Sequence, residues 1–283
     1  MSAPGARGRV LIIAGSDSGG GAGIQADIKT VTALGGYAMT AVTALTAQNT
    51  LGVHGVIGVD PDFIAQQMTV VLDDLGADAL KTGMLHSAPV ITAVCDVIAA
   101  AAPGLPLVAD PVMYAKGGHA LLQPEAMETL TARLLSLAAV VTPNLPEAAA
   151  LTGLQIETVE DMEAAGRALI ARGAGAALVK GGHLEGPRLY DVLVHAGGVR
   201  VFEDARIETA HTHGTGCTLA SALSCGLAQG MDLESAVARA RAYVRQAIAQ
   251  APGFGSGHGP LDHGHTASRP SMASTRLADA RPR

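Results

Sequence analysis

Short aliphatic runs alternate along the chain with longer segments in which apolar residues recur every three or four positions. The short runs have the length and composition of buried parallel strands, at residues 10–14, 78–81, 107–110, 139–142 and 176–180. The longer, Ala-rich segments predict helices at residues 22–34, 61–74, 89–101, 124–135, 146–151, 159–172, 216–228 and 233–249. This alternation predicts an α/β fold: a mainly parallel sheet with helices on both faces and ligands bound at the carboxyl ends of the strands.

Two regions and the end of the chain depart from this alternation. Residues 37–47 and 54–59 have the pattern of consecutive strands, as do residues 189–195 and 199–207 around a Gly-Gly pair typical of a hairpin. From Pro252 the chain turns to Gly, Ser, His, Pro and Arg without periodicity, which predicts disorder. We therefore expect an N-terminal extension at 1–9, one domain at 10–251 and a disordered tail at 252–283.

Composition and charge narrow the function classes. The 283 residues are 48% hydrophobic, which is enough to bury a large core. A net charge of −6 without a basic stripe argues against nucleic acid as a partner. No apolar window reaches the length of about 18 residues that a membrane helix needs. The three cysteines form neither an even disulfide framework nor a Cys-x-x-Cys pair, so we expect a cytoplasmic protein.

A glycine-rich stretch, residues 14–23, follows the first predicted strand and opens a helix. Its backbone N–H groups could approach an anion or a polar ligand closely, although a purely structural turn is an alternative. Two familiar patterns fail here. Ile24 stands where a dinucleotide-binding loop has its third glycine, and Ile28 stands where a Walker motif has the glycine before its lysine. A Rossmann dehydrogenase is therefore disfavoured.

A second glycine-containing turn, residues 212–220, leads into an apolar helix and places Cys217 in the first helical turn. The positive end of a helix carries about half an elementary charge, which could hold a transferred phosphoryl group. The same field lowers the pKa of a thiol, which would make Cys217 a proton acceptor or nucleophile. Simple packing of a small buried cysteine is the alternative.

Polar residues also follow three other predicted strands. Asn144 and Glu147 come after residues 139–142, and an amide with a carboxylate suits a hydrated Mg²⁺. Asp110 ends another strand, and Lys180 ends a third, where a lysine can neutralise phosphate. Taken singly, each could equally be a solvated or helix-terminal charge.

Six segments, in this order, resemble the ribokinase-like superfamily and, within it, the hydroxymethylpyrimidine/phosphomethylpyrimidine kinases of thiamine biosynthesis. They are AGSDSGGGAGIQAD (14–27), TALTAQNT (43–50), KTGML (81–85), DPVM (110–113), TPNLPEA (142–148) and HGTGCT (213–218). The resemblance implies a three-layer α/β/α sandwich. It also implies ATP-dependent phosphorylation of 4-amino-5-hydroxymethyl-2-methylpyrimidine and then of its monophosphate.

The resemblance also implies roles at the matching positions. Gln48 would pair with the pyrimidine edge, in a pocket completed by Gly15, Asp27, Met84 and Val112. The catalytic turn would consist of an anion hole and the cysteine that replaces the aspartate base of the superfamily's sugar kinases: Gly214, Thr215, Gly216 and Cys217. ATP would contact Lys180, Asn144 and Thr212, and Glu147 with Asp110 would organise Mg²⁺.

Three questions stay open at this point. A pyridoxal or pyridoxine kinase of the same fold is one alternative function, and a pyrimidine-binding sensor without catalysis is another. Because the chain has no Trp and only three Phe and four Tyr, we expect aliphatic side chains to contact adenine. The edge strands near residues 37–59 could pair between subunits, and the family commonly dimerises, so we expect a homodimer.

Overall fold

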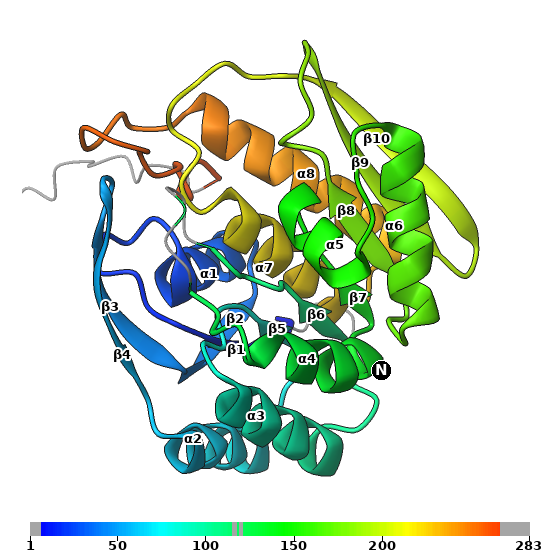
Figure 1. Ribbon diagram of the computed structural model, residues 1–283. Helices are drawn as coiled ribbons and strands as arrows, with labels where there is room; N and C mark the ends of the chain where they lie inside the picture. The colour runs from blue at the N-terminus through cyan, green and yellow to red at the C-terminus, as the bar shows by residue number, and fades with distance from the viewer. Residues whose placement is uncertain (1–6, 115–117, 119–120, 267–283) are drawn as a thin grey trace, which may run out of the picture.

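The main sheet has eight strands and is almost entirely parallel. The computed structural model describes residues 7–114, 118 and 121–266. Its strands are β1 (Arg9–Ala14), β2 (Tyr37–Val42), β5 (Ala79–Thr82), β6 (Leu107–Ala109), β7 (Val140–Val141), β8 (Ala177–Lys180), β9 (Arg188–His195) and β10 (Gly198–Ala205). They stand in the order β10-β9-β8-β7-β6-β5-β1-β2, and only β9 runs in the direction opposite to the other strands (Figure 1). The predicted mainly parallel sheet is confirmed.

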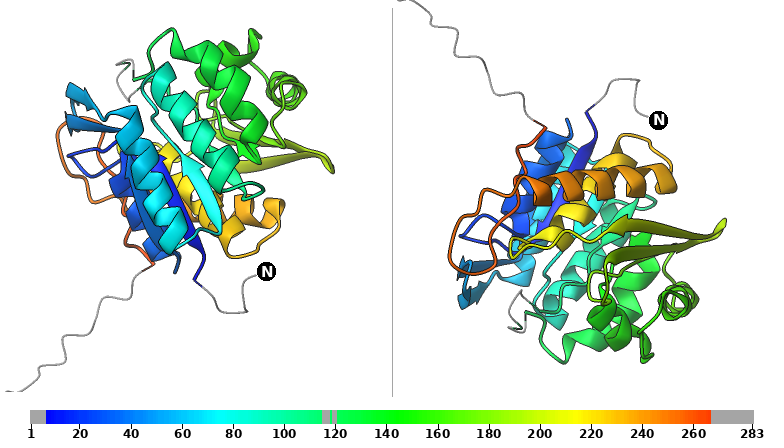
Figure 2. Two further views of the ribbon diagram at one scale, coloured as in Figure 1. Left: turned by 90° about the horizontal axis from the view of Figure 1, so that it is seen from below. Right: turned by 90° about the horizontal axis from the view of Figure 1, so that it is seen from above.

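Helices cover both faces of this sheet, which confirms the predicted three layers (Figure 2). One face carries α1 (Gly23–Ala33), α7 (Thr215–Ala228) and α8 (Leu233–Ala249); the other carries α2 (Pro61–Asp74), α3 (Ala88–Ala101), α4 (Ala126–Thr129), α5 (Leu145–Thr152) and α6 (Val159–Ala171). Successive side chains of a strand point to opposite faces. Leu11 and Ile13 therefore pack into the core under α2 and α3, whereas Val10 and Ile12 pack against α1 and α7. No helix in the described part of the chain is long and apolar enough to cross a membrane.

The helix expected at residues 124–135 is shorter and changes form. After α4, the chain widens into a π-helical turn, η1 (Leu130–Leu134), and then tightens into η2 (Leu135–Leu137). This change of pitch turns Leu130, Leu134 and Leu135 all into the core.

The single strand expected at residues 37–47 is two strands in two sheets. The chain leaves the main sheet after β2, passes Thr43, and continues as β3 (Ala44–Asn49), which pairs only with β4 (Gly52–Gly58). Thr43 is buried at this junction, and its hydroxyl donates to the carbonyl of Met84. The two-stranded sheet thus projects from the edge of the molecule and carries Gln48 towards the carboxyl ends of the central strands.

The expected boundaries of the domain are wrong at both ends. Arg9 belongs to β1, and its guanidinium is 2.8 Å from the Asp78 carboxylate. Residues 252–266, expected to be disordered, form a strap that runs beside the end of the β3–β4 hairpin (Figure 1, orange-red). Leu261 and His263 of this strap are buried. The rest of the expected tail, residues 267–283, lies outside the described residues.

Backbone hydrogen bonds hold the strap, which is why its composition misleads. The amide of His258 donates to the carbonyl of Thr50 at the hairpin end, and the carbonyl of Gly259 accepts from the amide of His213. A Cβ on Gly257 would lie 2.1 Å from that Thr50 oxygen, so only glycine permits the approach. A segment held in this way needs no periodic apolar pattern.

Candidate active site

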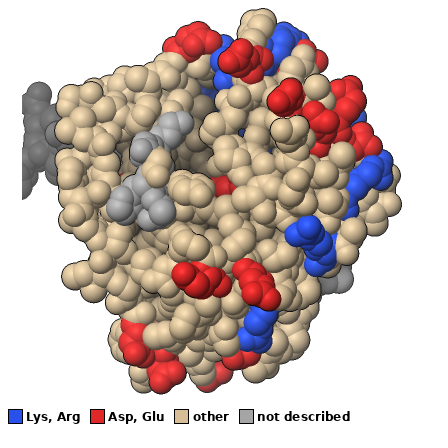
Figure 3. Space-filling model, in the orientation of Figure 1, with Lys and Arg blue, Asp and Glu red and all other residues tan. Residues whose placement is uncertain are grey.

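One cavity of about 700 Å³ runs along the carboxyl ends of the parallel strands. This volume is typical of a small-molecule site. Figure 3 shows the face of the molecule hollowed near its centre, with the charged side chains in view mostly at the periphery. The cavity is lined by every site residue expected from the sequence except Asp27: Gly15, Gln48, Met84, Asp110, Val112, Asn144, Glu147, Lys180, Thr212, Gly214, Thr215, Gly216 and Cys217.

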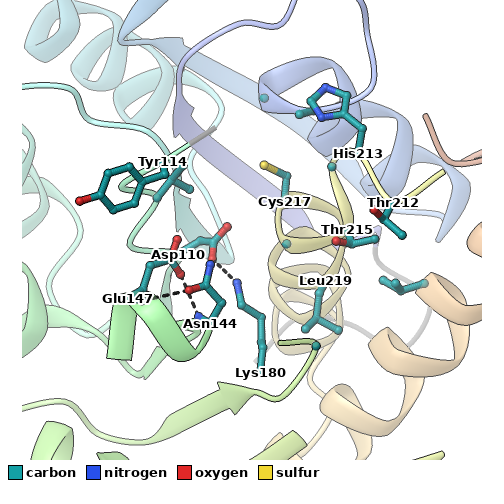
Figure 4. Close-up of a pocket in the computed structure, with 18 of the residues that line it drawn as sticks. Asp110, Tyr114, Asn144, Glu147, Lys180, Thr212, His213, Thr215, Cys217 and Leu219 are labelled. Atoms are coloured by element: carbon teal, nitrogen blue, oxygen red, sulfur yellow. Dashed lines mark hydrogen bonds and ion pairs between the residues drawn. The ribbon is translucent and has the colours of Figure 1, made fainter. Parts of the chain in front are cut away.

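The middle of the cavity contains an ion pair between two strand ends. Nζ of Lys180 lies 2.9 Å from Oδ1 of Asp110 (Figure 4). The hydroxyl of Thr142 donates to the same oxygen at 3.0 Å. Burial works to lower the pKa of Lys180, but the carboxylates of Asp110 and Glu147 outweigh it, so the pKa is raised. Lys180 is therefore a permanent cation.

Asn144 and Glu147 form the N-terminal capping box of α5. The Asn144 side chain accepts from the Glu147 amide at 2.9 Å, and the Glu147 carboxylate accepts from the Asn144 amide at 2.8 Å (Figure 4). Burial, partly opposed by Lys180 and aided by Asp110, raises the pKa of Glu147 to about 7. Two neighbouring carboxylates, one of them disfavoured as an anion, suit a divalent cation with oxygen ligands.

The N-terminus of α7 faces this ion pair. A Cβ on Gly216 would lie 3.2 Å from Nζ of Lys180 and 3.7 Å from Oδ2 of Asp110. Gly214 caps the helix with a φ of 83°, and a Cβ there would lie 1.8 Å from the carbonyl oxygen of Gly21. The N–H groups at the start of α7 and the lysine thus converge on a space that suits a phosphoryl group.

Cys217 lies where expected, but its ionisation differs from the expectation. Burial, only partly offset by the positive charge of Lys81, raises the pKa of Cys217 to about 11. The field of the helix terminus lowers the pKa of an exposed thiol, but here removal from water is the larger effect. With its pKa raised, the Cys217 thiol is protonated at physiological pH, and its role as proton acceptor or nucleophile stays a prediction.

The residues expected to contact the pyrimidine lie near the end of β1. Gly15 follows β1 directly, and a Cβ there would lie 2.3 Å from Cε of Met84, so glycine leaves room for that side chain. Val112 packs in the same apolar cluster as Met84. Gln48 enters from the two-stranded sheet.

The expected pocket residue Asp27 lies beneath the cavity instead. Its carboxylate is fully buried, bound to Nζ of Lys81 at 2.9 and 3.0 Å and to the hydroxyl of Ser221 at 2.6 Å. Asp27 therefore links α1, β5 and α7 under Cys217. Lys81, which the sequence analysis gave no role, does line the cavity.

Two further residues of the cavity wall were missed, although both stand in the resembling segments. Asp17 is buried at the start of the glycine-rich loop, and Nε2 of His213 lies 2.8 Å from its Oδ2. His213 directly precedes the anion-binding turn. Its position beside Gly214 was the available signal, but the distance of 196 residues to Asp17 gave no sign of the pairing.

The opposite end of the cavity, near β8 to β10, combines aliphatic side chains with charged ones. It is lined by side chains that follow β10 or lie on α7 and α8, namely Arg206, Ile207, Leu219, Val244, Arg245 and Ile248. The guanidinium of Arg206 is occupied by carbonyls of the loop after β8, including those of Gly182 and Gly186.

Comparison with known proteins agrees with this geometry. Residues 17–262 match the family described as phosphomethylpyrimidine kinase. A hydroxymethylpyrimidine/phosphomethylpyrimidine kinase of Streptomyces coelicolor is 47% identical over 255 residues, covering 90% of this chain and 94% of that protein. A bifunctional thiamine biosynthesis protein of Geobacter sulfurreducens is 50% identical, covering 92% of this chain, which spans about half (53%) of that longer protein.

Solved structures with bound ligands are also similar. Pyridoxal kinase from Staphylococcus aureus, in complex with AMP-PCP and pyridoxal, is 36% identical with a TM-score of 0.84. The match covers 92% of this chain and 94% of that one. It is less similar in sequence than the two pyrimidine-pathway proteins.

Proposed function

The chain belongs to the phosphomethylpyrimidine kinase family, and from this premise we propose which residues carry its two phosphoryl transfers. The acceptor is the hydroxymethyl group of 4-amino-5-hydroxymethyl-2-methylpyrimidine in the first transfer and the phosphate of the resulting monophosphate in the second. ATP is the donor, and the product belongs to thiamine biosynthesis. The observation that carries the proposal is the convergence of the α7 N-terminus with Lys180 at a single point of the cavity.

The two substrates occupy opposite ends of the cavity. The pyrimidine lies at the β1 end against Gly15, Met84 and Val112, with Gln48 at its polar edge. ATP lies at the β8 end, with adenine against Leu219 and its aliphatic neighbours and with phosphates reaching Thr212, Asn144 and Lys180. The acceptor oxygen and the γ-phosphorus then meet at the first turn of α7.

The first transfer forms a bond between the acceptor oxygen and the γ-phosphorus and breaks the bond to ADP. Charge spreading over the phosphoryl oxygens is stabilised by the N–H groups of Thr215, Gly216 and Cys217 and by Lys180. The acceptor proton leaves late, once the new bond makes that oxygen acidic, and passes to water, so no strong base is needed. Cys217 contacts and orients the hydroxyl as a neutral thiol.

Glu147 and Asp110 are the residues that would hold Mg²⁺, with Asn144 close by. The donor set fits: two carboxylates at the cavity wall, with remaining positions filled by water and ATP phosphates. Bound there, Mg²⁺ would neutralise charge on the phosphates.

A direct assay tests the proposal. Purified protein with ATP and the hydroxymethylpyrimidine should release one ADP per monophosphate formed, and then a second ADP with the pyrophosphate. Faster turnover of pyridoxal would make the protein a pyridoxal kinase. Tight pyrimidine binding without any transfer would make it a sensor.

A cytoplasmic homodimer completes the proposal. Leu45 and Ile57 are directly paired across β3 and β4, and both are more than half exposed on the outer face of the two-stranded sheet. Leu51 at the hairpin end is exposed too. Covering these side chains with the same sheet of a second copy would bury them, and sedimentation equilibrium tests the stoichiometry.

A further inference from the structure

Two polar side chains, those of His213 and Thr46, flank the Gln48 carboxamide where the glycine-rich loop, the two-stranded sheet and the start of α7 come together, and Asp17 binds His213. Nε2 of His213 lies 2.8 Å from Oδ2 of Asp17 and 3.5 Å from Nε2 of Gln48. On the other side of the carboxamide, Oγ1 of Thr46 lies 3.2 Å from Oε1 of Gln48. All four residues line the cavity.

The proton between Asp17 and His213 belongs to the histidine. Burial works to raise the pKa of Asp17, but hydrogen bonds from His213 and from the backbone of Ala22 and Gly19 outweigh it, so the pKa is lowered. An ionised carboxylate only accepts, so Nε2 of His213 must donate. That nitrogen then has no lone pair for a Gln48 N–H.

The hydroxyl proton of Thr46 is likewise used in a hydrogen bond to another group. The Thr46 hydroxyl donates its single proton to the carbonyl oxygen of Ser16, which lies 2.9 Å from Oγ1 and can only accept. Oγ1 of Thr46 therefore presents a lone pair to Gln48. The two neighbours of the carboxamide thus disfavour an N–H towards His213 and favour an NH₂ towards Thr46, and a half turn about χ3 of Gln48 supplies this arrangement. The single Nε2–H of His213 then donates mainly to Oδ2 of Asp17 at 2.8 Å, and Oε1 of Gln48 shares it as the second, weaker acceptor of a bifurcated hydrogen bond.

We propose that the Asp17–His213 pair is a specificity-determining pair that holds the Gln48 carboxamide with Oε1 towards His213 and Nε2 towards Thr46. The remaining lone pair and the remaining N–H of Gln48 then face the ligand in a fixed order. A 4-aminopyrimidine edge offers a donor beside the acceptor N3, whereas a 4-oxopyrimidine offers an acceptor beside a donor. The fixed carboxamide therefore selects the amino ring over the oxo ring.

The ring cannot turn over to suit a reversed carboxamide. Its hydroxymethyl group, next to the 4-substituent, must face the first turn of α7 for transfer, and this fixes which edge reaches Gln48. The inference rests on the proposed function, because it takes the pyrimidine as the ligand of Gln48.

Titration calorimetry without ATP tests the pair by measuring the affinity for 4-amino-5-hydroxymethyl-2-methylpyrimidine (the amino ring) and for its 4-oxo analogue (the oxo ring). The proteins compared are wild type, His213→Leu and His213→Gln. Wild type should prefer the amino ring by about 10- to 100-fold, the discrimination of one two-point polar contact. His213→Leu should bring the two affinities close together. His213→Gln should restore much of the preference, because its amide places an N–H near the position of Nε2.

His195→Leu is the matched control, since His195 is a half-buried histidine paired with Glu234 outside the cavity. Thr46→Val, nearly isosteric, removes the acceptor on the other side and should narrow the preference too, even if His213→Leu fails to fold. An unchanged preference in folded His213→Leu or in Thr46→Val overturns the inference alone. A wild type that binds neither ring overturns the proposed function and the inference with it.

Discussion

Replacing Lys81 by methionine removes the cation from an ion pair in which both side chains are wholly inaccessible to solvent. The Asp27 carboxylate would keep only the hydroxyl of Ser221. Breaking such a pair costs about 3–5 kcal/mol, because the remaining charge has neither water nor a counter-ion. A domain has about 5–15 kcal/mol of unfolding free energy in total, so Lys81→Met should be severely destabilised.

The size of that penalty should depend on pH. Burial already raises the pKa of Asp27, and without Lys81 the carboxyl would take up a proton in the folded state. A carboxyl whose folded pKa is raised contributes stability at low pH and loses it as the pH rises through that pKa. The destabilisation by Lys81→Met should therefore be smaller at pH 5 than at pH 8.

Urea unfolding followed by circular dichroism, at both pH values, measures this. The double variant Asp27→Leu/Lys81→Met replaces the pair by apolar side chains and should recover most of the loss, giving a coupling free energy of about 3 kcal/mol. If the double variant is no more stable than Lys81→Met, or if the penalty is the same at pH 5 and pH 8, the electrostatic explanation is refuted.

Three further predictions concern the cavity and the strap. The Cys217 thiol should react slowly with iodoacetamide at pH 7, and the rate, measured by mass spectrometry, should keep rising towards pH 11. A rate that has already reached its plateau at pH 8 would contradict the raised pKa. The pKa of Glu147 is about 7 in the folded protein against an ordinary 4.5, so the unfolding free energy should fall as the pH rises through 7. Between pH 5 and pH 8, without Mg²⁺, wild type should lose up to about 3 kcal/mol of unfolding free energy relative to Glu147→Gln. Unfolding free energies of the two proteins that change in parallel with pH would exclude this explanation. A chain ending at Ala251 should melt at a lower temperature and bind the pyrimidine more weakly than one ending at Thr266, which keeps the strap; equal affinity and melting temperature in both would show the strap to be dispensable.

Local signals predicted the helices well. The expected bounds of α2 and α8 are those observed, and both helices begin after an aspartate whose side chain accepts from backbone amides of the first turn. Asp60 followed by Pro61, and Asp232 before an amphipathic run, are features that short windows of sequence contain. The meeting of the polar residues that end several strands was predictable as well, because parallel strands place their carboxyl ends on one edge of the sheet.

The failures share a dependence on partners far along the chain. A strand pattern continues unbroken through Thr43, so nothing local marks the change of sheet. The Asp27 carboxylate takes its charge partner from 54 residues away. The pKa of Cys217 follows from burial, which exists only after α7 has packed. Composition at residues 252–266 resembles disorder because glycine backbone, not side chains, makes the contacts.

The strap also sets the order in which the site can be completed. Every strand and helix in the described part of the chain precedes residue 252, so a chain emerging from the ribosome can form the sheet and the β8 end of the cavity first. The hairpin end and His213 gain their shared support only when residues 257–263 have been made. On the proposed roles of Gln48 and His213, the pyrimidine end of the cavity would be the last part of the site to be completed, and a chain that ends before residue 257 would lack that support.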